Sequence, residues 1–241
     1  MLIRFLLTIV IISISTLPGE DYSSISTSRP GASNPTSAVP AGLYQFEMGT
    51  NLTTSPGMDT TIAIPMLLRL GVYKNIELQT AYANKYVTLG LLYGGISIIN
   101  QLENSIIFST SLTANNDSLT EFSAYLPISY SFHNGFSLWG QVAGTYFNND
   151  KSDPIINYSL AIGNSLGDNT NWFFETYQSR TIGDNSTNEN IPISVDCGIA
   201  YLAANNVQFD LSMGLTFQMV DSDYIETERF LEWGLSFRRP K

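Results

Sequence analysis

Charge and cysteine are both scarce in this 241-residue chain. Only 13% of its residues are charged, against about 25% in a typical soluble domain. The single cysteine, Cys197, excludes an intrachain disulfide. Lys and Arg number 11 against 21 Asp and Glu, for a net charge of −10. This excludes the basic surface that a nucleic acid would need, so we expect no nucleic-acid partner.

Catalytic and cofactor-binding motifs are also missing. The sequence contains no HExxH, no phosphate-binding glycine loop and no CxxC. Its sole histidine, His133, falls in a predicted turn at residues 133–135. A serine–histidine hydrolase would need that side chain held beside a serine nucleophile. We therefore predict that the chain is not an enzyme and binds no cofactor or metal.

Long apolar runs are absent after the N-terminus. Arg4 is followed by an apolar stretch at residues 5–14, which has the length of a signal-peptide core and is too short for a transmembrane helix. We predict a signal peptide at residues 1–19, with the cleavage site between Ser13 and Ser24. An uncleaved interfacial anchor is the alternative. The signal peptide predicts export.

What the sequence does have, from residue 43 onward, is alternation. Apolar and polar residues follow one another with period two, as in strands that have one apolar and one polar face. The clearest segment places Phe122, Leu126 and Ile128 opposite Glu121 and Ser123. The segments are residues 43–53, 60–72, 76–84, 86–98, 105–114, 121–132, 136–147, 156–166, 171–181, 191–203, 207–218 and 230–239. The faces of segment 171–181 are ambiguous because residues 172–174 are three consecutive aromatics.

The length and spacing of these segments indicate a membrane barrel. A tilted strand of about ten residues crosses a bilayer, and outer-membrane barrels alternate short turns with long loops. Most links follow that pattern. Link 84–85 is short where a loop is expected, and link 99–104 is long where a turn is expected. A soluble sandwich or lipocalin-like barrel is the alternative, but its outer face would carry many Lys and Glu. Here the polar faces are mostly Ser, Thr, Gly, Ala and Gln.

We therefore predict an all-β fold, a transmembrane antiparallel up-and-down β-barrel of about 12 strands over residues 43–241. The expected location is the outer membrane of a Gram-negative-type cell, and the expected state is a monomer. Its expected partners are outer-membrane lipid and an unidentified small-molecule solute. The charges on the polar faces would then point into the lumen. They are Glu47, Arg69, Glu77, Glu121, Asp196, Asp210, Glu232 and Arg238. An excess of carboxylates predicts a lumen with mild cation preference. The alternative is an internal salt-bridge network that closes a narrow barrel.

The segment before the barrel, residues 20–42, has no helix or strand period. Prolines at positions 30, 35 and 40 keep it out of a sheet interior. Arg29 is the only charge in residues 26–42. The segment could fold into the lumen as a plug, with Arg29 pairing inward carboxylates such as Glu47 or Glu77. The alternative is a disordered periplasmic tail.

Several short stretches are similar to one family. They are Arg29, Pro30 and Gly31, then residues 39–42, followed by Gln45, Phe46 and Glu47. Residues 67–72, 76–78, 88–91 and 234–237 also fit. On these residues the chain resembles the outer-membrane transporter family labelled "meta-pathway of phenol degradation". The resemblance implies a barrel for small organic molecules. We expect passive transport or binding of small solutes, with aromatic or hydrophobic molecules as candidates. The alternative is a closed structural or adhesion barrel that acts through its extracellular loops.

Overall fold

The computed structural model describes residues 24–28, 31–84, 86–113, 120–148, 152–183, 191–220 and 223–240. The elements in these residues are all strands. They are β1 (Leu43–Thr54), β2 (Thr61–Ala63), β3 (Met66–Tyr73), β4 (Ile76–Ala83), β5 (Tyr86–Ile99), β6 (Leu102–Thr113), β7 (Thr120–Ser131), β8 (Ser137–Phe147), β9 (Ile155–Ser165), β10 (Thr170–Thr181), β11 (Ile193–Ala204), β12 (Val207–Val220) and β13 (Asp223–Pro240). Among the described residues there is no helix long and apolar enough to span a membrane.

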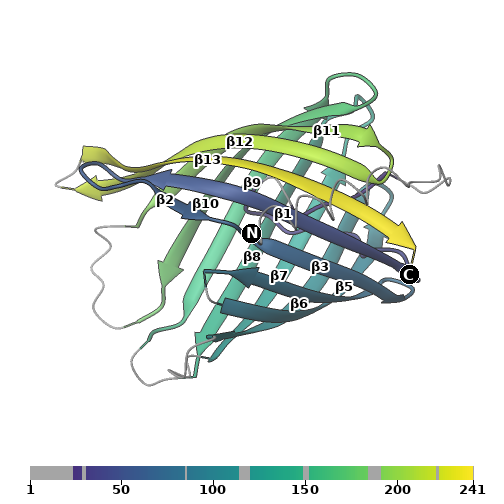
Figure 1. The fold of residues 1–241 in the computed structure, drawn as a ribbon, viewed down its shortest axis with the longest axis horizontal. Helices are drawn as coiled ribbons and strands as arrows, with labels where there is room; N and C mark the ends of the chain where they lie inside the picture. Colours follow the sequence, from purple (N-terminus) through teal and green to yellow (C-terminus); the bar gives the residue numbers. More distant parts are fainter. Residues whose placement is uncertain are drawn as a thin grey trace, which may run out of the picture.

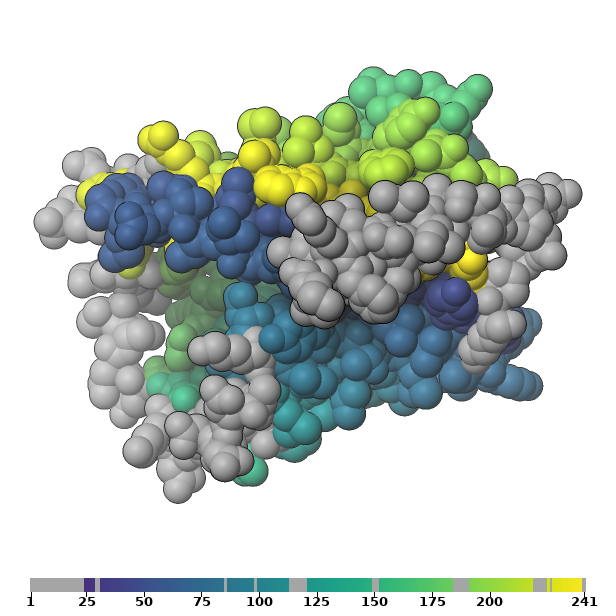
Figure 2. Space-filling view, viewed as in Figure 1, coloured from purple at the N-terminus to yellow at the C-terminus, as the bar shows by residue number. Residues whose placement is uncertain are grey.

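The strands form one closed antiparallel sheet. Strand β1 pairs with both β2 and β3, and from β3 to β13 each strand pairs with the next along the chain. Strand β13 returns to pair with the whole length of β1, from Leu43 opposite Pro240 to Thr54 opposite Arg229. The tilted strands wrap around a common axis (Figure 1), and the first and last strands meet on one face (Figure 2). Closure leaves no free sheet edge, which a spanning sheet requires. The predicted all-β antiparallel barrel is confirmed.

The barrel has twelve strands plus one short extra strand, because one predicted strand is divided. Segment 60–72 appears as β2 and β3, which both pair with β1. The break falls at Ile64 and Pro65. Proline has no backbone N–H to give to the ladder, so it interrupts the pairing. The carbonyl of Pro65 still accepts a bond of 3.1 Å from the Gly49 N–H, which keeps the two halves against β1.

The barrel is apolar outside and polar inside. On the outer face large hydrophobic side chains are exposed, such as Phe122 at 50% exposure, whereas Glu47 on the inner face is 1% exposed. This reverses the distribution of a soluble domain, so the surrounding medium must be lipid and the soluble barrel is excluded. The protein is an outer-membrane barrel. In β10 the alternation resolves the aromatic run, because Phe173 is buried inside and Phe174 is exposed outside.

Most of the short turns lie at one end of the barrel, which identifies that end as periplasmic. The expectation of a long link at 99–104 is wrong. Strand β5 runs to Ile99 and β6 begins at Leu102, leaving Asn100 and Gln101 as the turn. Gln101 has a φ of 78°, a turn conformation that alternation alone does not reveal. Link 84–85 is short, as the sequence indicates, with Asn84 at a φ of 47°.

The described part of the N-terminal segment, residues 24–28 and 31–42, lies inside the barrel. At one end the Ile25 N–H donates to the Asn205 carbonyl at the β11–β12 turn, at 2.9 Å. At the other end the Gly42 N–H donates to the Gly71 carbonyl on β3, at 3.0 Å. Both ends are therefore at the periplasmic side, and the residues between them occupy the lumen near that side.

Candidate functional site in the lumen

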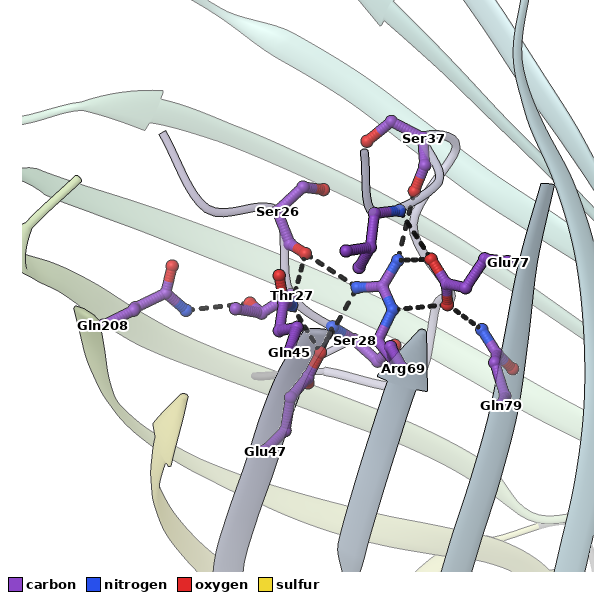
Figure 3. Close-up of polar contacts among 11 residues, drawn as sticks. Ser26, Thr27, Ser28, Ser37, Gln45, Glu47, Arg69, Glu77, Gln79 and Gln208 are labelled. Atoms are coloured by element: carbon purple, nitrogen blue, oxygen red, sulfur yellow. Dashed lines mark hydrogen bonds and ion pairs between the residues drawn. The ribbon is translucent and has the colours of Figure 1, made fainter. Parts of the chain in front are cut away.

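A fully buried arginine joins two carboxylates on the β1–β3–β4 side of the lumen. From β3, Arg69 donates through Nε and Nη2 to the two oxygens of Glu77 on β4, at 2.6 and 2.9 Å. Its Nη1 lies 3.2 Å from Oε1 of Glu47 on β1. The guanidinium of Arg69 lies between the carboxylates of Glu47 and Glu77 (Figure 3). Two-point contact with Glu77 gives this pair directional, charge-assisted bonds, and buried charges need such partners. We name Glu47, Arg69 and Glu77 the Arg69 cluster.

The Arg69 cluster binds the backbone of the N-terminal segment (Figure 3). Arg69 Nη1 donates to the Ser26 carbonyl at 2.7 Å, and Nη2 to the Ser37 carbonyl at 3.1 Å. Glu47 accepts the Ser28 N–H at 3.0 Å, and Glu77 accepts the Val39 N–H at 2.7 Å. These are main-chain contacts, so they depend on the path of the segment and not on its side chains.

Two amides from the wall complete this cluster. Gln45 Nε2 donates to Glu47 and to the Ser26 carbonyl, each at 2.8 Å. Gln79 Nε2 donates to Glu77 at 2.8 Å. Period-two alternation predicts both glutamines on the inner face but gives them no role. The sequence feature that could have identified them is their spacing, because each lies two residues from a glutamate of the Arg69 cluster on the same face of its strand.

The opposite wall also holds the segment. Glu175 on β10 accepts the Ala32 N–H at 2.6 Å and the Ser33 hydroxyl. Gln141 on β8 accepts both the N–H and the side-chain amide of Asn34, at 3.0 and 2.8 Å. Further hydrogen bonds come from Ser105 on β6, Ser129 on β7, Ser159 on β9 and Gln208 on β12. The segment is therefore bound around most of the barrel circumference.

Two wall glycines let the segment approach the strands. A Cβ on Gly71 would lie 2.0 Å from the Pro40 carbonyl oxygen. A Cβ on Gly94 would lie 2.8 Å from the Thr36 carbonyl oxygen. Both contacts are to backbone, so a larger residue at either position would displace the segment. The sequence shows these glycines on inner faces, but only the fold shows what lies against them.

Among the described residues, two of the cavities lie along the β10–β12 side of the lumen. The periplasmic cavity has a volume of about 240 Å³ and includes Asn34, Trp139, Phe173 and Gln208 in its lining, with no ionisable side chain. The outer cavity has a volume of about 300 Å³ and includes Tyr177, Ser194, Thr216 and Glu232. The N-terminal segment forms one wall of the periplasmic cavity, so a solute there would touch both the segment and the barrel.

The structure separates the predicted inward charges into groups. Glu47, Arg69 and Glu77 meet in the Arg69 cluster, while Asp196, Asp210, Glu232 and Arg238 face the lumen from β11, β12 and β13. Glu121, half-buried near the outer end of β7, is not part of the Arg69 cluster. Arg29 lies outside the described residues, so its pairing with Glu47 or Glu77 stays a prediction; both carboxylates contact Arg69. Among the described side chains, no group of three or more His, Cys, Asp or Glu could hold a metal ion.

A family profile matches most of the chain. The family is described as "Putative MetA-pathway of phenol degradation", and the match covers residues 27–233. This range begins within the N-terminal segment and ends in β13, so it includes the Arg69 cluster and nearly all the residues that line the two lumen cavities. A comparison with curated protein sequences finds no match.

Solved structures with a similar fold are outer-membrane channels at low sequence identity. The COG4313 outer membrane channel from Pseudomonas putida F1 has a TM-score of 0.62 at 8% identity, over 87% of this chain and 100% of that chain. The NanC porin has a TM-score of 0.60 at 10% identity, over 80% and 98%. The CymD monoaromatic hydrocarbon channel has a TM-score of 0.54 at 9% identity, over 84% and 89%. At these identities the likeness is one of fold.

Proposed function

The chain belongs to the family of the meta-pathway of phenol degradation, and we propose that it is a channel for passive movement of small solutes across the outer membrane. The observation that carries this proposal is the pair of cavities along the β10–β12 side. One opens in the periplasmic half of the lumen and the other in the outer half. A barrel closed by an internal salt-bridge network throughout would leave no such spaces.

The N-terminal segment narrows this channel as a plug. Its hydrogen bonds to the inner faces of β1, β3 and β4 and to those of β6 through β10 support this role. Many individually modest bonds to main-chain groups hold one backbone path. Solute would pass between the segment and the β10–β12 wall, because that is where the described side chains leave space.

The periplasmic cavity favours small, uncharged, planar solutes. Trp139 and Phe173 offer aromatic surfaces, and Asn34 and Gln208 offer amide groups that can hydrogen-bond a polar substituent. A cavity of about 150 Å³ already accepts benzene in an engineered protein. The cavity here, at about 240 Å³, has room for one aromatic ring with a substituent. The printed name of the CymD channel, a monoaromatic hydrocarbon channel, agrees in solute class.

Planar-bilayer recording tests the channel and the plug together. The full-length protein should show discrete conductance steps, and a variant lacking residues 26–41 should show larger ones. Equal steps in both proteins would refute the plug. No steps in either protein would favour the closed structural or adhesion barrel that acts through its loops.

Solute selectivity is measured from the swelling rates of liposomes that contain the protein. Phenol should enter faster than benzoate, which is planar and similar in size but charged at neutral pH. The Trp139→Ala variant should reduce this preference, whereas Trp233→Phe, a change on the outer face, should leave it intact. Equal rates for phenol and benzoate in the wild type would contradict the assignment of the periplasmic cavity.

A further inference from the structure

Four aromatic side chains on the inner face of β8, β10 and β13 line the two lumen cavities. Trp139 on β8 and Phe173 on β10 line the periplasmic cavity. Tyr177 on β10 and Phe230 on β13 line the outer cavity. We name these four side chains the lumen aromatics. Each cavity thus has an aromatic pair, and the strand register shows how the two pairs lie relative to each other.

Glycines on the neighbouring strands let the periplasmic pair lie along the wall. A Cβ on Gly163 of β9 would lie 2.7 Å from Cη2 of Trp139. A Cβ on Gly198 of β11 would overlap the ring of Phe173. In the register Gly163 and Gly198 are the two direct partners of Phe173, and the Cβ positions of direct partners lie about 5 Å apart. The Trp139 ring therefore ends beside Phe173, and the Phe173 ring in turn covers Gly198.

The outer pair extends along the wall in the same way. Phe230 leans from β13 over its direct partner on β12, Gly214, where a Cβ would overlap the ring. Its ring centroid lies 6.5 Å from that of Tyr177 on β10, with the ring planes at 51°. Strands β11 and β12 lie between these two residues. The two side chains therefore lean toward each other across the inner face of β11 and β12.

The two pairs adjoin over β11 and β12. Gly198, which lies under Phe173, is a diagonal neighbour of Gly214, which lies under Phe230, since their register positions differ by two residues. Diagonal neighbours in a sheet lie about 7–8 Å apart, which is within reach of aromatic side chains. The lumen aromatics therefore follow one another from the outer cavity to the periplasmic cavity.

One carboxylate lies between the two pairs on β10, and the N-terminal segment binds it. Glu175 is between Phe173 and Tyr177 on the inner face and is 1% exposed. It accepts the Ala32 N–H at 2.6 Å and the Ser33 hydroxyl. A buried carboxylate that has such donors is less costly than one that lacks them. The segment therefore compensates the charge that would otherwise interrupt the aromatic lining.

We propose that the lumen aromatics form a continuous track along which planar aromatic solutes move between the two cavities by ring contact. This inference deepens the proposed channel function and rests on it. Aromatic pairs gain a modest free energy beyond their buried area, and conduction requires binding at several sites that is weak enough for release. A saturated ring of similar size and polarity is not planar and lacks this contact. The track therefore selects for planarity, in addition to the selection against charge in the periplasmic cavity.

Blockage of the ion current in planar bilayers tests the track with two neutral diols. They are resorcinol and its saturated analogue, cyclohexane-1,3-diol. Resorcinol should interrupt the KCl current of the wild type at about three- to tenfold lower concentration, the range expected for an aromatic contact. Tyr177→Leu and Phe230→Leu should each remove most of this difference, whereas Tyr177→Phe keeps the ring and should keep the difference.

Tyr125→Leu is the matched control for these variants. It removes an aromatic side chain from the inner face of β7 that lines neither cavity. The difference between the two diols should therefore persist in this variant. A loss in Tyr125→Leu as large as that in Tyr177→Leu would overturn the track, because the preference would then not depend on the lumen aromatics.

Titration calorimetry in detergent measures binding of the same diols without conduction. Tighter binding of resorcinol by the wild type, with loss of this preference in Tyr177→Leu and Phe230→Leu, supports the track. If that result came with no current in bilayers, the channel function alone would fail. Equal binding of the two diols by the wild type, or a preference that both leucine variants retain, would overturn the track.

Discussion

The buried carboxylates on two sides of the lumen differ in how fully they are hydrogen-bonded. On the β1–β3–β4 side, Arg69 and two amides supply donors to Glu47 and Glu77, and the N-terminal segment adds its own N–H groups. On the β11–β13 side, Asp196 keeps a buried oxygen with no partner among the described residues. The first arrangement holds a segment in place. The second leaves one carboxylate oxygen without a donor from the described residues.

The largest effect is expected on the β1–β3–β4 side, where the buried carboxylates have hydrogen-bond donors. Arg69→Met leaves Glu47 and Glu77 buried without their cation, so we expect a loss of about 3–5 kcal/mol in the free energy of unfolding. The N-terminal segment would also lose its bonds at Ser26 and Ser37. Urea unfolding in lipid vesicles measures the stability, and bilayer conductance measures release of the segment.

The control for this prediction removes the charges together. The triple variant Glu47→Gln, Arg69→Met and Glu77→Gln should recover much of the lost stability, because replacing a whole buried ion cluster is often close to neutral. If Arg69→Met alone were as stable as the wild type, the Arg69 cluster would not be the main attachment of the segment.

A middle-sized effect is expected where the segment approaches the wall. Gly71→Val would place side-chain atoms where the Pro40 carbonyl now lies, 2.0 Å from the Cβ position. We expect a loss of about 1–3 kcal/mol from overpacking, with larger conductance steps as the segment moves. Gly144→Ala is the matched control, since its Cβ position has nothing within 4 Å. Equal behaviour of the two variants would show that this close approach does not hold the segment.

The smallest effect is expected outside the lumen. Cys197 is exposed on the outer face of β11, next to Asp196 in sequence but on the opposite side of the sheet. Cys197→Ala should change stability by about 0.5 kcal/mol or less and leave the reversal potential unchanged. A shift in ion selectivity in Cys197→Ala would contradict the inside–outside assignment on which the comparison of the two sides depends.

Much of the wall was predictable because strand alternation is local. Glu47, Arg69 and Glu77 were expected on the inner face from the parity of their positions alone, and they are there. The divided strand at Pro65 and the turn at Gln101 were not predicted. Segment 60–72 has one continuous alternating pattern despite its proline, and alternation does not show where β5 ends and β6 begins. Glu175 was missed because three consecutive aromatics obscure the alternation just before it.

The sequence by itself determined the alternating strands and most of the charges on their inner faces. Period-two alternation assigns each side chain to a face, whichever strand lies next to it. Only the tertiary structure decided that Arg69 joins two glutamates and that the proline-rich segment threads between them and Glu175. Those contacts join residues up to 143 positions apart. They depend on strand register and barrel closure, which bring distant parts of the chain together and leave no local trace in the sequence.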